Sequence, residues 1–158
     1  MIHRVGMAQA KIALPGDSLL ALGLGSCVCV ALHDAAAQVG GLVHIMLPSS
    51  EQFREEPPGK CADTAVPHLL EMMVEGGASP ARVRAKLAGG AQMFATQGGE
   101  RALRIGPRNV EAAYAALRQY GVPILAAAVG GSVGRTVELF PQSGDLVVRT
   151  VRGGEERL

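Results

Sequence analysis

The hydrophobic and polar positions of this chain predict many short strands. Apolar runs rich in Val, Ile and Leu are typical of strands when turn residues bound them. Residues 83–87 alternate apolar with basic side chains, which indicates a strand with one buried face. The other runs predict strands at 7–13, 19–24, 28–32, 39–46 and 124–129, and a hairpin joining 136–140 to 146–151.

Two segments show helical spacing instead. One helix is predicted from Asp63, as its N-cap, to about residue 74, and the other from Pro107 to Tyr120. Many strands with only two helices predict an α+β fold in which antiparallel pairing is prominent. We expect a single domain over 1–158 with a frayed tail at 153–158, and a mobile surface loop at 49–60.

The hairpin of strands 28–32 and 39–46 carries the first candidate chemistry. A four-residue loop at 34–37, centred between Ala35 and Ala36, places Cys27 directly opposite His44. Directly opposed residues have Cβ atoms roughly 4.5–5.5 Å apart and share one face of the sheet. The predicted register therefore brings a thiol and an imidazole together, and a slip of one residue would separate them onto opposite faces.

Composition excludes several classes of function. The chain has 158 residues, 48% of them hydrophobic and 18% charged, with a formal net charge of +1. A nucleic-acid binder would carry a basic patch or stacking aromatics, but aromatic residues make up only 3% and Trp is absent. The longest uncharged stretches, 18–32 and 121–134, are shorter than the ~20 residues of a membrane span. Three cysteines without a secretory signal predict free thiols in the cytoplasm.

Cys27 has two interpretations at this stage. It is either a buried core cysteine, which is common for this residue type, or a nucleophile in the glycine-flanked run Gly23-Leu24-Gly25-Ser26-Cys27. In the second case the backbone around Gly25 and Ser26 could direct N–H groups at an oxyanion. Cys29 is predicted to be a core residue, and Cys61 has no nearby base. A metal site is not expected, because Cys27-Val28-Cys29 lacks a second cluster at ligand spacing.

Six motifs together make the chain resemble the CheD family of chemoreceptor glutamine deamidases. They occur in family order over nearly the whole chain, so the resemblance is specific. They are Gly-Leu-Gly-Ser-Cys-Val at 23–28, Val-His-Ile-Met-Leu-Pro at 43–48, Ala-Asp-Thr-Ala-Val-Pro at 62–67, Gly-Gly-Ala-Gln-Met-Phe at 89–94, Ile-Gly-Pro-Arg-Asn at 105–109 and Gly-Gly-Ser-Val-Gly-Arg-Thr at 130–136.

The resemblance implies a catalytic pair, Cys27 and His44, that converts glutamine to glutamate through a thioester. The family often has a Thr as a third catalytic residue where this chain has Ala21. A backbone carbonyl near Ala21 could orient His44 instead, since a carbonyl has this role in related toxins. The alternative is a weakened enzyme retained as a binding module that regulates a CheC-type phosphatase.

The resemblance also implies a fold, a substrate and partners. The fold would be a three-layer α/β sandwich like the catalytic domain of the cytotoxic necrotizing factor toxins. The substrate would be glutamines on the cytoplasmic helices of chemoreceptors, at receptor arrays, and glutamyl methyl esters could also be hydrolysed. A CheC-type phosphatase would be the second partner, and no cofactor is required. Contacts with substrate or partner are expected from Gly89, Gly90, Gln92 and Phe94.

Overall fold

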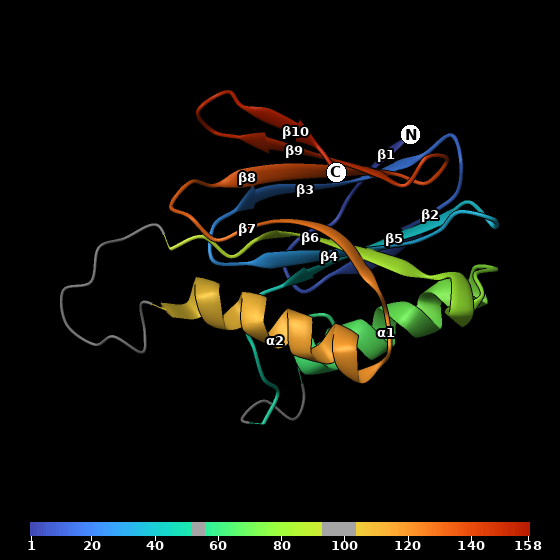
Figure 1. Ribbon diagram of the computed structural model, residues 1–158, viewed down its shortest axis with the longest axis horizontal. Coiled ribbons are helices and arrows are strands. Elements are labelled where there is room, and N and C mark those ends of the chain that lie inside the picture. The colour runs from blue at the N-terminus through green and yellow to red at the C-terminus, as the bar shows by residue number, and fades with distance from the viewer. Residues whose placement is uncertain (52–55, 93–103) are drawn as a thin grey trace.

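The computed structural model describes residues 1–51, 56–92 and 104–158. Two five-stranded sheets and one layer of helices form a three-layer sandwich (Figure 1). The strands are β1 (Ile2–Arg4), β2 (Ala10–Ala13), β3 (Ser18–Leu24), β4 (Val28–Asp34), β5 (Val39–Ile45), β6 (Arg84–Gly89), β7 (Ile124–Val129), β8 (Arg135–Phe140), β9 (Asp145–Thr150) and β10 (Glu155–Arg157). The helices are α1 (Ala62–Glu75), α2 (Ile105–Gln119) and the short 3₁₀ helix η1 (Pro80–Arg82).

The sheets differ in what covers them. Sheet A has the strand order β1-β3-β8-β9-β10, and sheet B has the order β2-β5-β4-β6-β7. Sheet B lies in the middle of the sandwich, with sheet A on one face and both α-helices on the other (Figure 1). Among the described strand pairs only β1–β3 and β6–β7 are parallel. The predicted α+β sandwich with largely antiparallel sheets is confirmed.

The middle position of sheet B explains the long apolar runs of its strands. Side chains alternate between the two faces of a strand, and both faces of β4 are covered, so nearly every residue is buried. One face joins the core between the sheets, which includes Leu19, Ala21, Leu24, Cys29, Ala31, Leu42 and Val137. The other face joins the core under the helices, which includes Val28, Val30, Leu32, Val43, Leu69, Met73 and Leu117.

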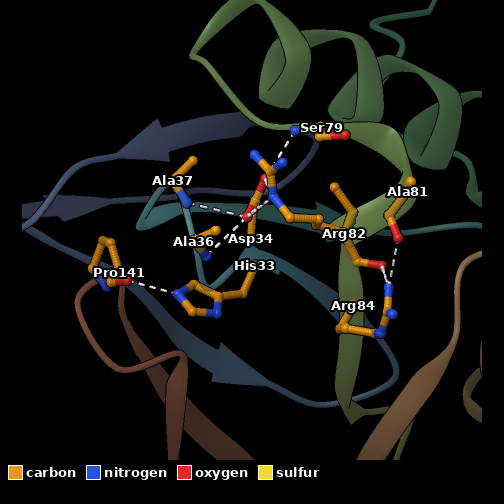
Figure 2. Close-up of polar contacts among 10 residues, drawn as sticks. His33, Asp34, Ala36, Ala37, Ser79, Ala81, Arg82, Arg84 and Pro141 are labelled. Atoms are coloured by element: carbon orange, nitrogen blue, oxygen red, sulfur yellow. Dashed lines mark hydrogen bonds and ion pairs between the residues drawn. The ribbon is translucent and has the colours of Figure 1, made fainter.

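The predicted turn between β4 and β5 is wrong by one residue. Asp34 is not in the turn but pairs with Val39 as the last pair of the ladder. Its carboxylate accepts the N–H groups of Ala36 and Ala37 at 3.0 and 3.1 Å, which closes the turn over the strand end (Figure 2). Gln38 completes the turn with a φ of 54°, a left-handed conformation that the sequence pattern did not indicate.

The corrected turn shifts the register of the hairpin. Cys29, not Cys27, lies directly opposite His44. Because the shift amounts to two residues, it leaves every side chain on its predicted face. The predicted shared face is therefore confirmed, although the predicted direct opposition of Cys27 and His44 is wrong. β4 and β5 are interior strands of sheet B, so the two residues lie at the strand ends and not at a sheet edge.

The predicted frayed tail is also wrong. Strand β10 pairs with β9 in antiparallel fashion, and Leu158 exchanges two backbone hydrogen bonds with Leu146. Arg157 forms an ion pair with Asp145 at 2.8 Å. The polar sequence gave no hydrophobic signal for a strand, because β10 is an exposed edge held by backbone hydrogen bonds and charge.

The segment between β5 and α1 is anchored at its described ends. Cys61 is the N-cap of α1, and Asp63, which the sequence suggested as the cap, instead accepts the N–H and hydroxyl of Ser50. The Lys60 carbonyl accepts the N–H of Met46 at 2.8 Å. The mobility expected for 49–60 stays a prediction, and its residues 52–55 lie outside the described ranges. No helix in those ranges is long and apolar enough to cross a membrane.

Candidate active site

Cys27 lies on the connection that leaves β3 in sheet A and enters β4 in sheet B. The side chain is half-buried and packs against the core between the sheets. The backbone on either side of it is held by the segment that follows β6. The Cys27 carbonyl accepts the N–H of Gly90, and the Gly25 carbonyl accepts the N–H of Ala91, both at 2.8 Å. The thiol is thus carried by an anchored backbone.

This anchoring requires glycine after β6. Gly89 has a φ of 111°, and a Cβ built on it would lie 2.2 Å from the Cys27 carbonyl oxygen. Gly90 has a φ of 69°, and its Cβ would lie 2.2 Å from a methyl group of Val110 in α2. Only a residue without a side chain lets the backbone approach Cys27 this closely in this conformation.

His44 occupies the inner face of sheet B, near the end of β5. Its side chain is only 3% exposed. The ring nitrogen Nδ1 lies 3.2 Å from the backbone carbonyl oxygen of Val5. Because a carbonyl can only accept, Nδ1 carries the proton in this hydrogen bond, and Nε2 of the neutral ring is left with a free lone pair. Nε2 is buried and has no hydrogen-bond partner in the described part of the chain.

The carbonyl that orients His44 comes from a place the sequence did not indicate. Val5 follows β1, and its N–H donates to the Leu20 carbonyl of β3 at 2.8 Å. Leu20 precedes Ala21, whose side chain is fully buried in the core between the sheets. The orienting group is therefore a backbone carbonyl, as expected, but it belongs to Val5 and not to β3.

The corrected register makes Cys29 a competitor for the role of nucleophile, and burial decides between the two thiols. Cys29 lies opposite His44 but is fully buried, and burial raises its pKa far above the ordinary thiol value, with a smaller contribution from Cys27. Cys27 lies two residues earlier, just before β4 begins, and is partly exposed to solvent. Of these two thiol residues, only Cys27 is partly open to solvent.

Burial also sets the resting charge of the pair. It raises the pKa of the Cys27 thiol and lowers the pKa of His44, and the hydrogen bond to Val5 opposes the second effect only in part. Both shifts favour the uncharged forms, a thiol and a neutral imidazole. In cysteine hydrolases with a neutral resting pair, the imidazole acts as a base during the reaction, because a resting thiolate is disfavoured.

Asn109 is the second residue to which the sequence analysis gave no role, although it closes the motif at 105–109. It lies in α2, is fully buried, and donates from Nδ2 to the backbone carbonyls of Ser26 and Met46 at 2.9 Å each. Its Oδ1 atom has no hydrogen-bond partner in the described ranges. A lone Asn inside the helical pattern of 105–119 is the signal that could have drawn attention to it.

The residues predicted to contact substrate or partner make contacts within the chain, and their contact with a substrate or partner stays a prediction. Gly89 and Gly90 hold the Cys27 connection through their backbone, as described above. The N–H of Gln92 donates to the Gly131 carbonyl at 2.9 Å, and Phe94 lies outside the described ranges. Within those ranges no three His, Cys, Asp or Glu side chains gather as metal ligands would.

The glycine-rich loop after β7 holds the end of β6, which in turn contacts the backbone of Cys27. The Gly89 carbonyl accepts the N–H of Gly130 at 3.0 Å and the guanidinium of Arg135 at 3.3 Å. Hydrogen bonds thus join the described parts of five of the six motifs around Cys27: 23–28, 43–48, 89–92, 105–109 and 130–136. The motif at 43–48 contributes His44 itself.

Comparison with known proteins identifies relatives along almost all of the chain. The family described as CheD chemotactic sensory transduction matches residues 46–150. A probable chemoreceptor glutamine deamidase CheD of Desulfitobacterium hafniense is 45% identical over 152 residues, which cover 96% of this chain and 95% of that protein. The chemoreceptor glutamine deamidase CheD of Halalkalibacterium halodurans is 44% identical over 159 residues, which cover 99% and 98%.

A third relative and one solved structure complete the comparison. A probable chemoreceptor glutamine deamidase CheD of Caldanaerobacter subterraneus is 46% identical over 154 residues, covering 97% of this chain and 95% of that protein. The hypothetical protein YfiH of Bacillus licheniformis superposes with a TM-score of 0.46 at 14% identity, covering 81% of this chain and 59% of that one. A similarity this low carries no information about function.

Proposed function

Because this chain belongs to the CheD family, we propose that it is a chemoreceptor glutamine deamidase that uses Cys27 as nucleophile and His44 as base. The observation that carries the proposal is the hydrogen bond from His44 Nδ1 to the Val5 carbonyl. It leaves Nε2 as a proton acceptor on the face of sheet B that Cys27 shares. The Ala21 position therefore does not deprive the site of an orienting group.

The first half of the proposed reaction forms a thioester. His44 Nε2 takes the proton of the Cys27 thiol, and the sulfur attacks the side-chain carbonyl carbon of the substrate glutamine. The carbonyl oxygen becomes an oxyanion, which the backbone N–H groups of Ser26 and Cys27 would bind. Among the described residues neither N–H has a hydrogen-bond acceptor, whereas the carbonyls of 25–27 are all engaged. When the carbon–nitrogen bond breaks, the imidazolium gives its proton to the leaving ammonia.

The second half hydrolyses the thioester and regenerates the free enzyme. Water gives a proton to His44, the resulting hydroxide attacks the thioester carbon, and the Cys27 sulfur leaves and is reprotonated by the imidazolium. The products are glutamate and ammonia. A glutamyl methyl ester would follow the same steps with methanol as the leaving group. A CheC-type phosphatase as second partner and a location at cytoplasmic receptor arrays belong to the same proposal.

The decisive test compares two cysteine variants on a chemoreceptor cytoplasmic fragment. Mass spectrometry of the fragment and ammonia release together report the conversion of glutamine to glutamate. We expect Cys27→Ala to remain folded and lose turnover, because the covalent route is removed. The matched control, Cys29→Ala, should lose about 1 kcal/mol of stability through the small cavity it leaves, while its folded fraction retains turnover.

Two outcomes would contradict the proposal. Full turnover by Cys27→Ala would move the nucleophile elsewhere. A wild-type chain that leaves every receptor glutamine unconverted, yet binds and activates a CheC-type phosphatase, would support the binding module instead.

A further inference from the structure

The backbone strands that carry Cys27 and His44 separate at the site. The ladder of β4 and β5 ends with the pair Val28 and Ile45, and hydrogen-bonded pairs alternate along an antiparallel ladder, so Ser26 and Leu47 would be the next pair to exchange backbone hydrogen bonds. Instead the N–H of Leu47 donates to the Lys60 carbonyl at 3.1 Å, and the Ser26 carbonyl accepts the side-chain amide of Asn109 at 2.9 Å. No backbone hydrogen bond therefore joins Ser26 to Leu47, both of which lie in the described ranges.

One side chain joins them across this gap. The Nδ2 group of Asn109 has two hydrogens, and it donates to the carbonyl before Cys27 and to the carbonyl two residues after His44, at 2.9 Å each. Both acceptors are carbonyls, so the orientation of the amide is fixed by its partners. Asn109 comes from α2, a separate element that contacts neither strand through a ladder.

Stability alone does not explain an asparagine here. The residue is fully buried, and its Oδ1 has no partner in the described ranges, so the amide loses hydration that only its nitrogen recovers. An unsatisfied buried acceptor in a native core calls for a reason beyond packing. The geometry supplies one, because Ser26 adjoins the nucleophile and Met46 lies just past the strand that carries the base.

We propose that Asn109 is a positioning residue that sets the separation between the Cys27 connection and the end of β5. The inference rests on the proposed function of the Cys27–His44 pair. Without the amide, the Ser26 and Met46 carbonyls lose their shared donor and the two segments can part. A displacement of about 1 Å in reacting groups can reduce a rate by roughly 100-fold.

The test uses Asn109→Asp and Asn109→Ala in the full chain. The aspartate keeps the shape but offers no donor to either carbonyl, and the alanine removes the group without adding charge. The control is Leu117→Ala, a buried residue of the same helix that packs in the core under the helices. It should lower the melting temperature and leave the site intact.

Two readouts separate positioning from general stability. At a temperature where circular dichroism shows each variant folded, we expect kcat for the receptor fragment to fall at least tenfold in both Asn109 variants, with KM little changed. The second-order rate of Cys27 alkylation by iodoacetamide at neutral pH should fall in parallel, and its pH profile should lose the acceleration that depends on neutral His44 as a proton acceptor. Leu117→Ala should match the wild type in both measurements.

Wild-type values of kcat and of the alkylation profile in a folded Asn109 variant would overturn the inference. Failure of both variants to fold would also overturn it, because Asn109 would then be a requirement of the fold. If the wild type converts no receptor glutamine, the proposed function fails, and the alkylation measurement still tests Asn109 independently.

Discussion

Replacing Ala21 by Thr tests whether this site lacks an orienting hydroxyl. Ala21 lies on β3 opposite Val137, with its side chain fully buried between the sheets. The substitution introduces the threonine that the resemblance to the CheD family led us to expect at this position. In this chain, however, His44 Nδ1 already donates to the Val5 carbonyl at 3.2 Å. A new hydroxyl would compete with an existing acceptor and would not fill an empty place.

The expected magnitudes follow from this competition. Exchanging one neutral hydrogen bond for another changes the free energy by less than about 0.7 kcal/mol, which corresponds to roughly threefold in rate. Two additional heavy atoms in the packed core should cost about 1–3 kcal/mol of stability. We therefore expect Ala21→Thr to lower the free energy of unfolding while turnover per folded molecule changes by less than about threefold.

The assay is single-turnover deamidation of a receptor fragment, with urea unfolding of each variant in parallel. Ala21→Val is the matched control, since it has the same shape as threonine without the hydroxyl. Equal rates for the two variants would show that volume alone acts. A tenfold gain in Ala21→Thr that Ala21→Val lacks would refute the reasoning and show that the Val5 carbonyl orients His44 poorly.

Two further predictions concern the ends of β4. Arg82, with its Nε 3.0 Å from the Asp34 carboxylate, and backbone N–H donors hold the pKa of Asp34 well below its usual range (Figure 2). The stability from the ionised carboxylate is present above the unfolded pKa of about 3.9 and is lost as pH falls below it. Asp34→Asn should thus lower the free energy of unfolding by about 2–3 kcal/mol at pH 7, and that free energy should then decrease less steeply as the pH falls. Urea unfolding at several pH values measures both effects, and a pH dependence equal to that of the wild type would contradict the prediction. Gly89→Ala should displace the Cys27 carbonyl and lower turnover at least tenfold in the folded fraction, whereas Gly16→Ala, with a φ of 99° and no atom within 4 Å of its Cβ, should keep wild-type turnover; equal rates would refute the argument.

The shared face of the candidate pair could be predicted from the sequence because it depends only on the period of a strand. The turn after β4 was misplaced, yet the error moved the register by two residues and left Cys27 and His44 on one face. Which cysteine lies directly opposite His44 depends on which turn residue takes a left-handed φ. That residue is Gln38, and glutamine is not a residue type that indicates this conformation. Burial then distinguished Cys27 from Cys29, which the strand pattern alone does not do.

The supporting residues could not be predicted, for physical reasons. Val5 acts through its backbone carbonyl, which every residue type has, so the sequence does not indicate this role. Asn109 acts on carbonyls 83 and 63 positions away along the chain, so its partners become apparent only once the layers are assembled. Glycine at 89 was visible in the sequence, but its role in admitting the Cys27 carbonyl required the structure.

Val5 couples the two sheets mechanically, because it forms hydrogen bonds with both of them. Its N–H is held by the Leu20 carbonyl of sheet A, and its own carbonyl holds the imidazole carried by sheet B. Any shear of one sheet over the other is therefore transmitted to the tilt of the His44 ring. The orientation of the imidazole therefore depends on how the two sheets are aligned. Substitutions that loosen sheet A far from the site would reduce turnover at conditions where the protein is still folded.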